Sequence, residues 1–195
     1  MKLKQTECYK QAAEARWLTF SNILTLSRIF LAPVIFVGIA QSWWQFSFII
    51  FLVAAATDLL DGHLARALND KTSLGTLLDP IADKIFLLTT FCALSFYGTP
   101  LFKIPWWFFL FVVIREIVLV VGGIFLICRF DSMAIKPSLW GKMTTFLQLL
   151  FIAWVIIGGQ FCYCLLVILT IFSCMSLVHY IYYGFQLPKK NGKND

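Results

Sequence analysis

The chain has 195 residues, of which 60% are hydrophobic and only 13% are charged. An average soluble domain has roughly 25% charged residues, and a soluble protein this small could not hide so much apolar surface, so lipid must cover much of it. The formal net charge is +6, but the basic residues gather at the ends of apolar runs and form no continuous stripe, which excludes nucleic acid as a partner and indicates a membrane surface.

Residues 1–20 are predicted to form an amphipathic helix that lies on the membrane surface. Basic and apolar side chains are mixed throughout this segment. They include Lys2, Lys4, Lys10, Arg16, Leu3, Tyr9, Trp17 and Leu18. No apolar core followed by a small-residue cleavage site is present in this segment, so it is not expected to be a cleavable signal peptide.

Six apolar runs follow, each close to the length of about 20 residues that crosses a bilayer. They cover residues 23–40, 44–67, 74–97, 105–128, 139–158 and 161–185, with turn residues between them. The basic segment 188–195 is predicted to be a flexible tail. We therefore predict an all-α integral membrane protein, with an N-terminal interfacial helix and a domain of six transmembrane helices over residues 21–187.

The basic residues predict the orientation of these spans. Arg28, Lys84 and Arg115 lie well inside the predicted spans, away from their ends. Of the thirteen other Lys and Arg residues, twelve lie on the side that the two termini share, and only Lys103 lies on the other. The positive-inside rule places that shared side in the cytosol. We predict a multi-pass protein of the cell membrane whose termini and segment 58–83 face the cytosol.

Four aspartates stand around the loop between the second and third spans. Asp58 and Asp61 are three residues apart, and Asp79 and Asp83 are four apart, so each pair shares one helix face. If the chain reverses near residues 69–70, two antiparallel helices present four carboxylates to one another. One buried aspartate costs about 2.5–3.5 kcal/mol even on a lenient insertion scale. Mg²⁺ or Mn²⁺ can neutralise such a cluster and keep positions open for phosphate.

Small residues beside the aspartates fit a phosphate site. Gly62 and Ala65 would let a nucleotide approach the backbone, and Gly75 would let the helices come close. A solvated loop with stray charges is the plainest alternative, but the shared helix faces argue against it. A transporter or channel would spread acidic residues through the depth of several spans, whereas here they cluster at one edge. The pattern therefore favours a metal-dependent enzyme.

The run Asp58-Leu-Leu-Asp61-Gly62-His-Leu-Ala65-Arg66, then eight residues, Gly75, three residues, Asp79, three residues and Asp83, resembles the signature of the CDP-alcohol phosphotransferases. Members of that family transfer a substituted phosphate from a CDP-linked donor to an alcohol and release CMP. The resemblance implies that two divalent cations bind to Asp58, Asp61, Asp79 and Asp83. It also implies that Asp83 is the general base. The implied CDP-donor site contains Asp58, Asp61, Gly62, Ala65, Arg66 and Gly75.

Three cations outside the signature bear on the acceptor alcohol. Arg115 lies well inside the fourth span, which marks it as functional by default, and Lys136 and Lys142 stand at the entrance to the fifth. Together they could bind an acceptor phosphate. The structural alternatives are that Arg115 pairs with Glu116 or with an aspartate, and that the lysines anchor a helix at the interface.

Residues 21–28, Pro33 and the segments around these cations resemble two branches of the family, the phosphatidylglycerophosphate synthases and the CDP-type cardiolipin synthases. The resemblance implies CDP-diacylglycerol as donor and membrane lipids as surroundings. It favours glycerol 3-phosphate as acceptor, whereas the cardiolipin synthases use phosphatidylglycerol. A homodimer is common among such relatives, although no residue in the sequence indicates one.

Overall fold

The fold was taken from a computed structural model of the chain. It describes the backbone of residues 20–68, 73–130 and 139–191, and the side chains of residues 25–57, 81–123 and 139–182. The predicted interfacial helix lies outside the described residues, apart from Phe20 at its end.

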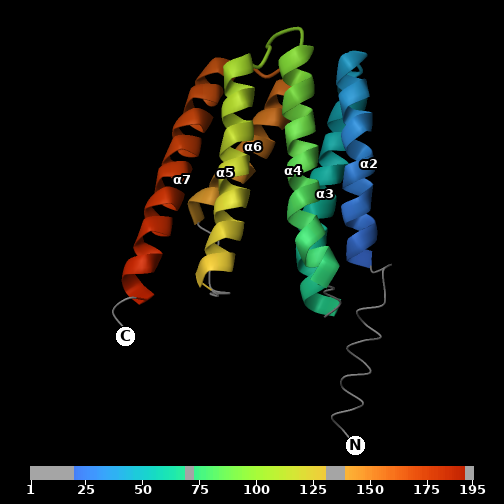
Figure 1. The fold of residues 1–195 in the computed structure, drawn as a ribbon. Helices are drawn as coiled ribbons and strands as arrows, with labels where there is room; N and C mark the ends of the chain where they lie inside the picture. Colours follow the sequence, from blue (N-terminus) through green and yellow to red (C-terminus); the bar gives the residue numbers. More distant parts are fainter. Residues whose placement is uncertain (1–19, 69–72, 131–138, 192–195) are drawn as a thin grey trace, which may run out of the picture. The chain divides into compact units, whose positions relative to one another are not determined.

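Every element in the described ranges is an α-helix (Figure 1), which confirms the all-α prediction. The helices are α2 (Phe20–Ala40), α3 (Trp44–Leu68), α4 (Ser73–Phe96), α5 (Trp106–Phe130), α6 (Leu139–Ile157) and α7 (Cys162–Asn191). Each predicted span overlaps one of them over most of its length. Among the described residues, three segments are long and apolar enough to cross a membrane: Trp106–Gly123, Leu139–Ile157 and Cys162–Tyr182. The apolar segments Thr25–Ala40 and Trp44–Thr57 are shorter.

Helix α7 corrects one predicted boundary. It continues to Asn191, although we predicted that a flexible tail, residues 188–195, begins at Pro188. The apolar pattern ends there, but a helix can continue without an apolar pattern. Lys189 and Lys190 are good helix formers, and cations are favoured near a helix C-terminus. Gly192, a residue type common just past a helix end, comes only afterwards in the sequence.

The described chain divides into two compact units, Met1–Ala93 and Leu94–Asp195. In the first unit, α2 and α3 pack side by side (Figure 1). The phenyl rings of Phe51 on α3 and Phe86 on α4 stack with centroids 6.0 Å apart. These contacts therefore connect all three helices of the first unit. The predicted six-helix domain, residues 21–187, spans both units and stays a prediction.

In the second unit, α7 packs against both α5 and α6. At one end of the unit, the ring centroids of Phe102 and Tyr163 are 4.9 Å apart, so the segment before α5 meets the start of α7. Farther along, the Tyr180 hydroxyl donates to the Leu119 carbonyl at 3.2 Å. A Cβ added to Gly122 would stand 2.9 Å from the Tyr180 ring, so the absence of a side chain there permits this close approach.

We expect Gly122→Val to lower the free energy of unfolding by about 1–3 kcal/mol, because overpacking a tight contact has that typical effect. The measurement is the midpoint of thermal unfolding in detergent. Gly141→Val is the matched control, because a Cβ at Gly141 meets nothing within 4 Å. Equal midpoints for the two variants would show that Gly122 is not needed for the contact with Tyr180.

Candidate active site

The predicted signature lies on two consecutive helices of the first unit. Positions 58–66 are in the last part of α3, and positions 75–83 are in the first half of α4. The helical backbone confirms that each aspartate pair occupies one helix face. Only residues 69–72 separate the helices, and Asp61 and Asp79 each stand about 10 Å along the axis from this segment. The side chains of residues 58–80 lie outside the described part, so their clustering stays a prediction.

Asp83 is the one signature aspartate whose side chain is described. It forms an ion pair with Arg28 of α2. The Arg28 side chain is 2% exposed and the Asp83 side chain is 38% exposed, so a buried guanidinium holds a carboxylate that stays open on one side. The ion pair orients this carboxylate and offsets part of the negative charge of the four aspartates.

Arg28 was not predicted as a site residue. The signal was present in the sequence, because a cation inside an apolar span marks a functional position by default. What the sequence did not reveal was its partner. The pairing joins α2 to α4 across the first unit, whereas we had placed the metal and donor sites on α3 and α4 alone.

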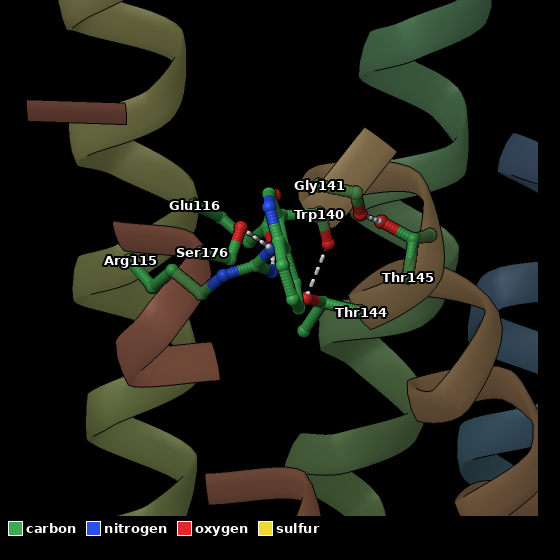
Figure 2. Close-up of polar contacts among 7 residues, drawn as sticks. All are labelled: Arg115, Glu116, Trp140, Gly141, Thr144, Thr145 and Ser176. Atoms are coloured by element: carbon green, nitrogen blue, oxygen red, sulfur yellow. Dashed lines mark hydrogen bonds and ion pairs between the residues drawn. The ribbon is translucent and has the colours of Figure 1, made fainter. Parts of the chain in front are cut away.

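Arg115 of α5 is fully enclosed in the second unit, with 1% of its surface exposed. Its Nη1 donates to Glu116 Oε1 at 2.5 Å, and its Nη2 donates to the Ser176 hydroxyl of α7 at 3.3 Å (Figure 2). The Glu116 pair is the structural alternative that the sequence left open. A pair with one neighbouring carboxylate still leaves guanidinium hydrogens that could bind an anion.

Of the two predicted lysines, only Lys142 lies among the described residues, and it is not joined to this arginine there. Lys142 is exposed in the first turn of α6, and within the described side chains no hydrogen bond or ion pair connects it to Arg115. Lys136 lies outside the described residues. The role of the lysines in binding an acceptor phosphate therefore stays a prediction.

The residues fit a divalent cation by their chemistry. Among the described residues there is no group of three or more His, Cys, Asp or Glu side chains, but three of the four signature aspartates are outside that set. Four carboxylates at helical spacing on adjoining ends of α3 and α4 supply the hard oxygen ligands that Mg²⁺ and Mn²⁺ prefer. The described ion pair of Asp83 is compatible with this, because part of its carboxylate remains open.

Residues 18–179 match the CDP-alcohol phosphatidyltransferase family. The chain belongs to this family. The CDP-alcohol phosphatidyltransferase match covers every predicted site residue and also Arg28. Members of the family are transferases and generally depend on divalent cations. Together with the three long apolar helices, family membership makes the chain a membrane-bound transferase.

Relatives in two branches of the family resemble the chain. One from Aquifex aeolicus, named CDP-diacylglycerol--glycerol-3-phosphate 3-phosphatidyltransferase, is 40% identical over 124 residues, or 64% of this chain and 67% of the relative. One from Mycobacterium tuberculosis, named a probable phosphatidylglycerophosphate synthase, is 33% identical over 74% of this chain and 68% of its own length. A rat protein named cardiolipin synthase (CMP-forming) is 27% identical over 89% of this chain and 68% of its own length.

Proposed function

We propose that this phosphatidyltransferase transfers the phosphatidyl group of CDP-diacylglycerol to glycerol 3-phosphate, which yields phosphatidylglycerophosphate and CMP. The observation that carries the proposal is the complete signature on α3 and α4, whose last aspartate, Asp83, is paired with a buried arginine. The Aquifex and Mycobacterium relatives support this choice of acceptor, because their names specify glycerol 3-phosphate or phosphatidylglycerophosphate.

The enzyme is proposed to cross the cell membrane six times, with residues 1–20 on the surface and both termini in the cytosol. The long apolar segments of α5, α6 and α7 support this arrangement, as does the distribution of basic residues. The apolar N-terminal part of α3, residues 44–57, precedes the signature, which begins at Asp58. The donor's acyl chains can then stay in lipid while its head group enters the polar site. A homodimer stays a prediction.

The donor half of the site is assigned to the signature residues. Two divalent cations, Mg²⁺ or Mn²⁺, would be held by Asp58, Asp61, Asp79 and Asp83. When bound, they would neutralise the negative charge of the donor pyrophosphate and of the CMP that leaves. Gly62 and Ala65 let the nucleotide approach the backbone of α3, and Arg66 binds its phosphates. Gly75 leaves room for the two helices to approach.

The acceptor hydroxyl is proposed to lose its proton to the Asp83 carboxylate. Its oxygen forms a bond to the phosphorus that carries diacylglycerol, and the bond from that phosphorus to the bridging oxygen breaks. CMP leaves with the electron pair. Arg28 acts on this step through Asp83, because it fixes the direction of the carboxylate and so the line along which the proton is taken.

The acceptor phosphate is assigned to Arg115, with Lys136 and Lys142 as further cations. Glu116 and Ser176 hold the two terminal nitrogens of Arg115, so the guanidinium is fixed before the anion arrives. A planar guanidinium can then donate hydrogen bonds to two phosphate oxygens at once. The rat relative supports the second candidate function, a cardiolipin synthase that uses phosphatidylglycerol. That acceptor also carries a phosphate, but it arrives through the membrane.

The test is an assay of purified protein in detergent with CDP-diacylglycerol, a divalent cation, and each acceptor in turn. We expect CMP release with glycerol 3-phosphate. We also expect Arg115→Ala to raise the KM for glycerol 3-phosphate about ten- to hundredfold, because a charge-assisted bond to phosphate contributes about 1.5–3 kcal/mol. The KM for CDP-diacylglycerol should change less.

Lys103→Ala is the control for this variant, because it removes an exposed cation from the side that we assign to the cell exterior. Arg115→Lys should recover only part of the affinity, since an ammonium lacks the planar fork. Turnover with phosphatidylglycerol and none with glycerol 3-phosphate would overturn the proposed acceptor and favour the cardiolipin candidate.

A further inference from the structure

Within the described residues, three buried side chains of the second unit carry polar atoms that have no hydrogen-bond partner. Gln148 on α6 and Ser173 on α7 are both 0% exposed. Within the described residues, the Gln148 amide has no partner for its Nε2 or its Oε1, and the Ser173 hydroxyl has none either. The Nε of Arg115 is also buried without a partner in that set. A buried polar group left in this state costs about 1–3 kcal/mol.

Gln148 and Ser173 lie on the faces through which α6 and α7 pack. On α6, Gln148 follows the same helical spacing as the buried residues Thr144, Phe151, Ile152 and Val155. On α7, Ser173 follows that of Leu166, Leu169 and Ser176. Gln148 is nine residues before the end of α6 and Ser173 is eleven after the start of α7. Both are therefore about 15 Å from the turn between these helices, to within one helical turn.

Arg115 lies at the same level. It is nine residues after the start of α5, or about 14 Å along the axis. The segment before α5 and the turn before α7 are at the same end of the unit, because the rings of Phe102 and Tyr163 are in contact. Gln148, Ser173 and the Nε of Arg115 thus form one polar layer, at one level within the apolar segments of α5, α6 and α7.

Neighbouring hydroxyls do not satisfy this layer. One turn from Gln148, the Thr144 hydroxyl donates to the Trp140 carbonyl at 2.7 Å, and one turn from Ser173, the Ser176 hydroxyl accepts from Arg115 (Figure 2). Lipid offers no hydrogen-bonding groups at mid-span. If Gln148 served only to pack, the protein would gain stability when an apolar residue of similar shape replaced it. The layer is therefore suited to bind a polar ligand.

The groups without hydrogen-bond partners define the chemistry of that ligand. Gln148 offers two N–H donors and one carbonyl acceptor without charge, and Ser173 offers one donor and an acceptor. A hydroxyl, which both donates and accepts, fits them. At the same level along the helices, Arg115 is suited to a phosphate. A short polyol that carries a phosphate has both groups within a few bonds of each other.

We infer that Gln148 and Ser173 bind the secondary hydroxyl of glycerol 3-phosphate, the one that does not react, next to the Arg115 phosphate site. This inference rests on the proposed function. It makes Gln148 a specificity-determining residue, because a site built to hydrogen-bond a substrate hydroxyl discriminates against an analogue that lacks it.

The experiment compares glycerol 3-phosphate with 3-hydroxypropyl phosphate, which lacks only the secondary hydroxyl. For the unmodified enzyme, we expect kcat/KM to be about 10- to 100-fold lower with the analogue, because buried partners are then left unsatisfied. Gln148→Leu should lower kcat/KM for glycerol 3-phosphate by a similar factor and change that for the analogue by less than about threefold. Ser173→Ala should act in the same direction with a smaller factor.

Thr145→Val is the matched control on α6, since that side chain is exposed and, among the described residues, its hydroxyl donates to the Gly141 carbonyl of its own helix. Thermal unfolding of each variant in detergent shows whether it folds. If Gln148→Leu does not fold, Gln148→Met and Ser173→Ala are compared in its place. Equal losses with both acceptors, or no discrimination by the unmodified enzyme, would overturn the inference while glycerol 3-phosphate remained the substrate. Turnover with phosphatidylglycerol alone would overturn the proposed function, and the inference with it.

Discussion

Asp83→Asn is expected to lower kcat for CMP release at least about 1,000-fold, while CDP-diacylglycerol still binds. General base catalysis contributes about 10²–10⁴-fold, and the amide can neither take the proton nor supply a second anionic oxygen to a cation. The substitution keeps the size of the side chain, and Arg28 can still donate to the amide oxygen. The donor remains bound through Arg66 and the other three aspartates. Single-turnover CMP release and donor binding are measured on the same preparation.

The control for this variant is Asp70→Asn, which removes the same charge from the segment between α3 and α4 but lies outside the signature. It should retain turnover close to that of the unmodified enzyme. If Asp83→Asn also did so, the assignment of Asp83 as base would be wrong. If Asp83→Asn lost donor binding together with turnover, Asp83 would act through the donor site rather than as the base.

Removal of divalent cations is expected to abolish CMP release, and added Mg²⁺ or Mn²⁺ should restore it. The reason is charge. Four aspartates are predicted to approach one another on two adjoining helix segments, and the donor adds a pyrophosphate. Arg28 offsets one of these charges through Asp83, and Arg66 can offset another, so most of the negative charge stays uncompensated without cations. The measurement is CMP release in excess chelator, followed by titration with each metal.

A variant of a proposed ligand sharpens this experiment. Asp61→Asn should raise the metal concentration required for half-maximal activity, because one carboxylate is lost from the ligand set. Arg115→Ala is the comparison, since it should raise the KM for glycerol 3-phosphate and leave the metal requirement unchanged. Undiminished turnover in excess chelator would contradict the metal-dependent mechanism and would leave the family assignment in place.

The sequence by itself determined the helices and the family. Apolar runs of about 20 residues specify where helices form, since each run is long enough to satisfy its backbone groups internally. The signature follows from fixed spacings, and a spacing of three or four residues on a helix sets a shared face before any tertiary contact exists. The end of α7 was missed because composition marks where apolar character stops, whereas a helix can continue through Pro188 and the lysines after it.

Only the tertiary structure decided which side chains meet. The partner of Arg28 is Asp83, 55 positions later in the sequence, and Arg115 reaches Ser176 on another helix. Such pairs depend on how helices pack, which a periodic pattern does not encode. The surroundings of Gln148 could not be predicted from the sequence either. In the sequence it is one polar residue in an apolar run, and its complete burial without a hydrogen-bond partner among the described residues follows from the packing of α6 on α7.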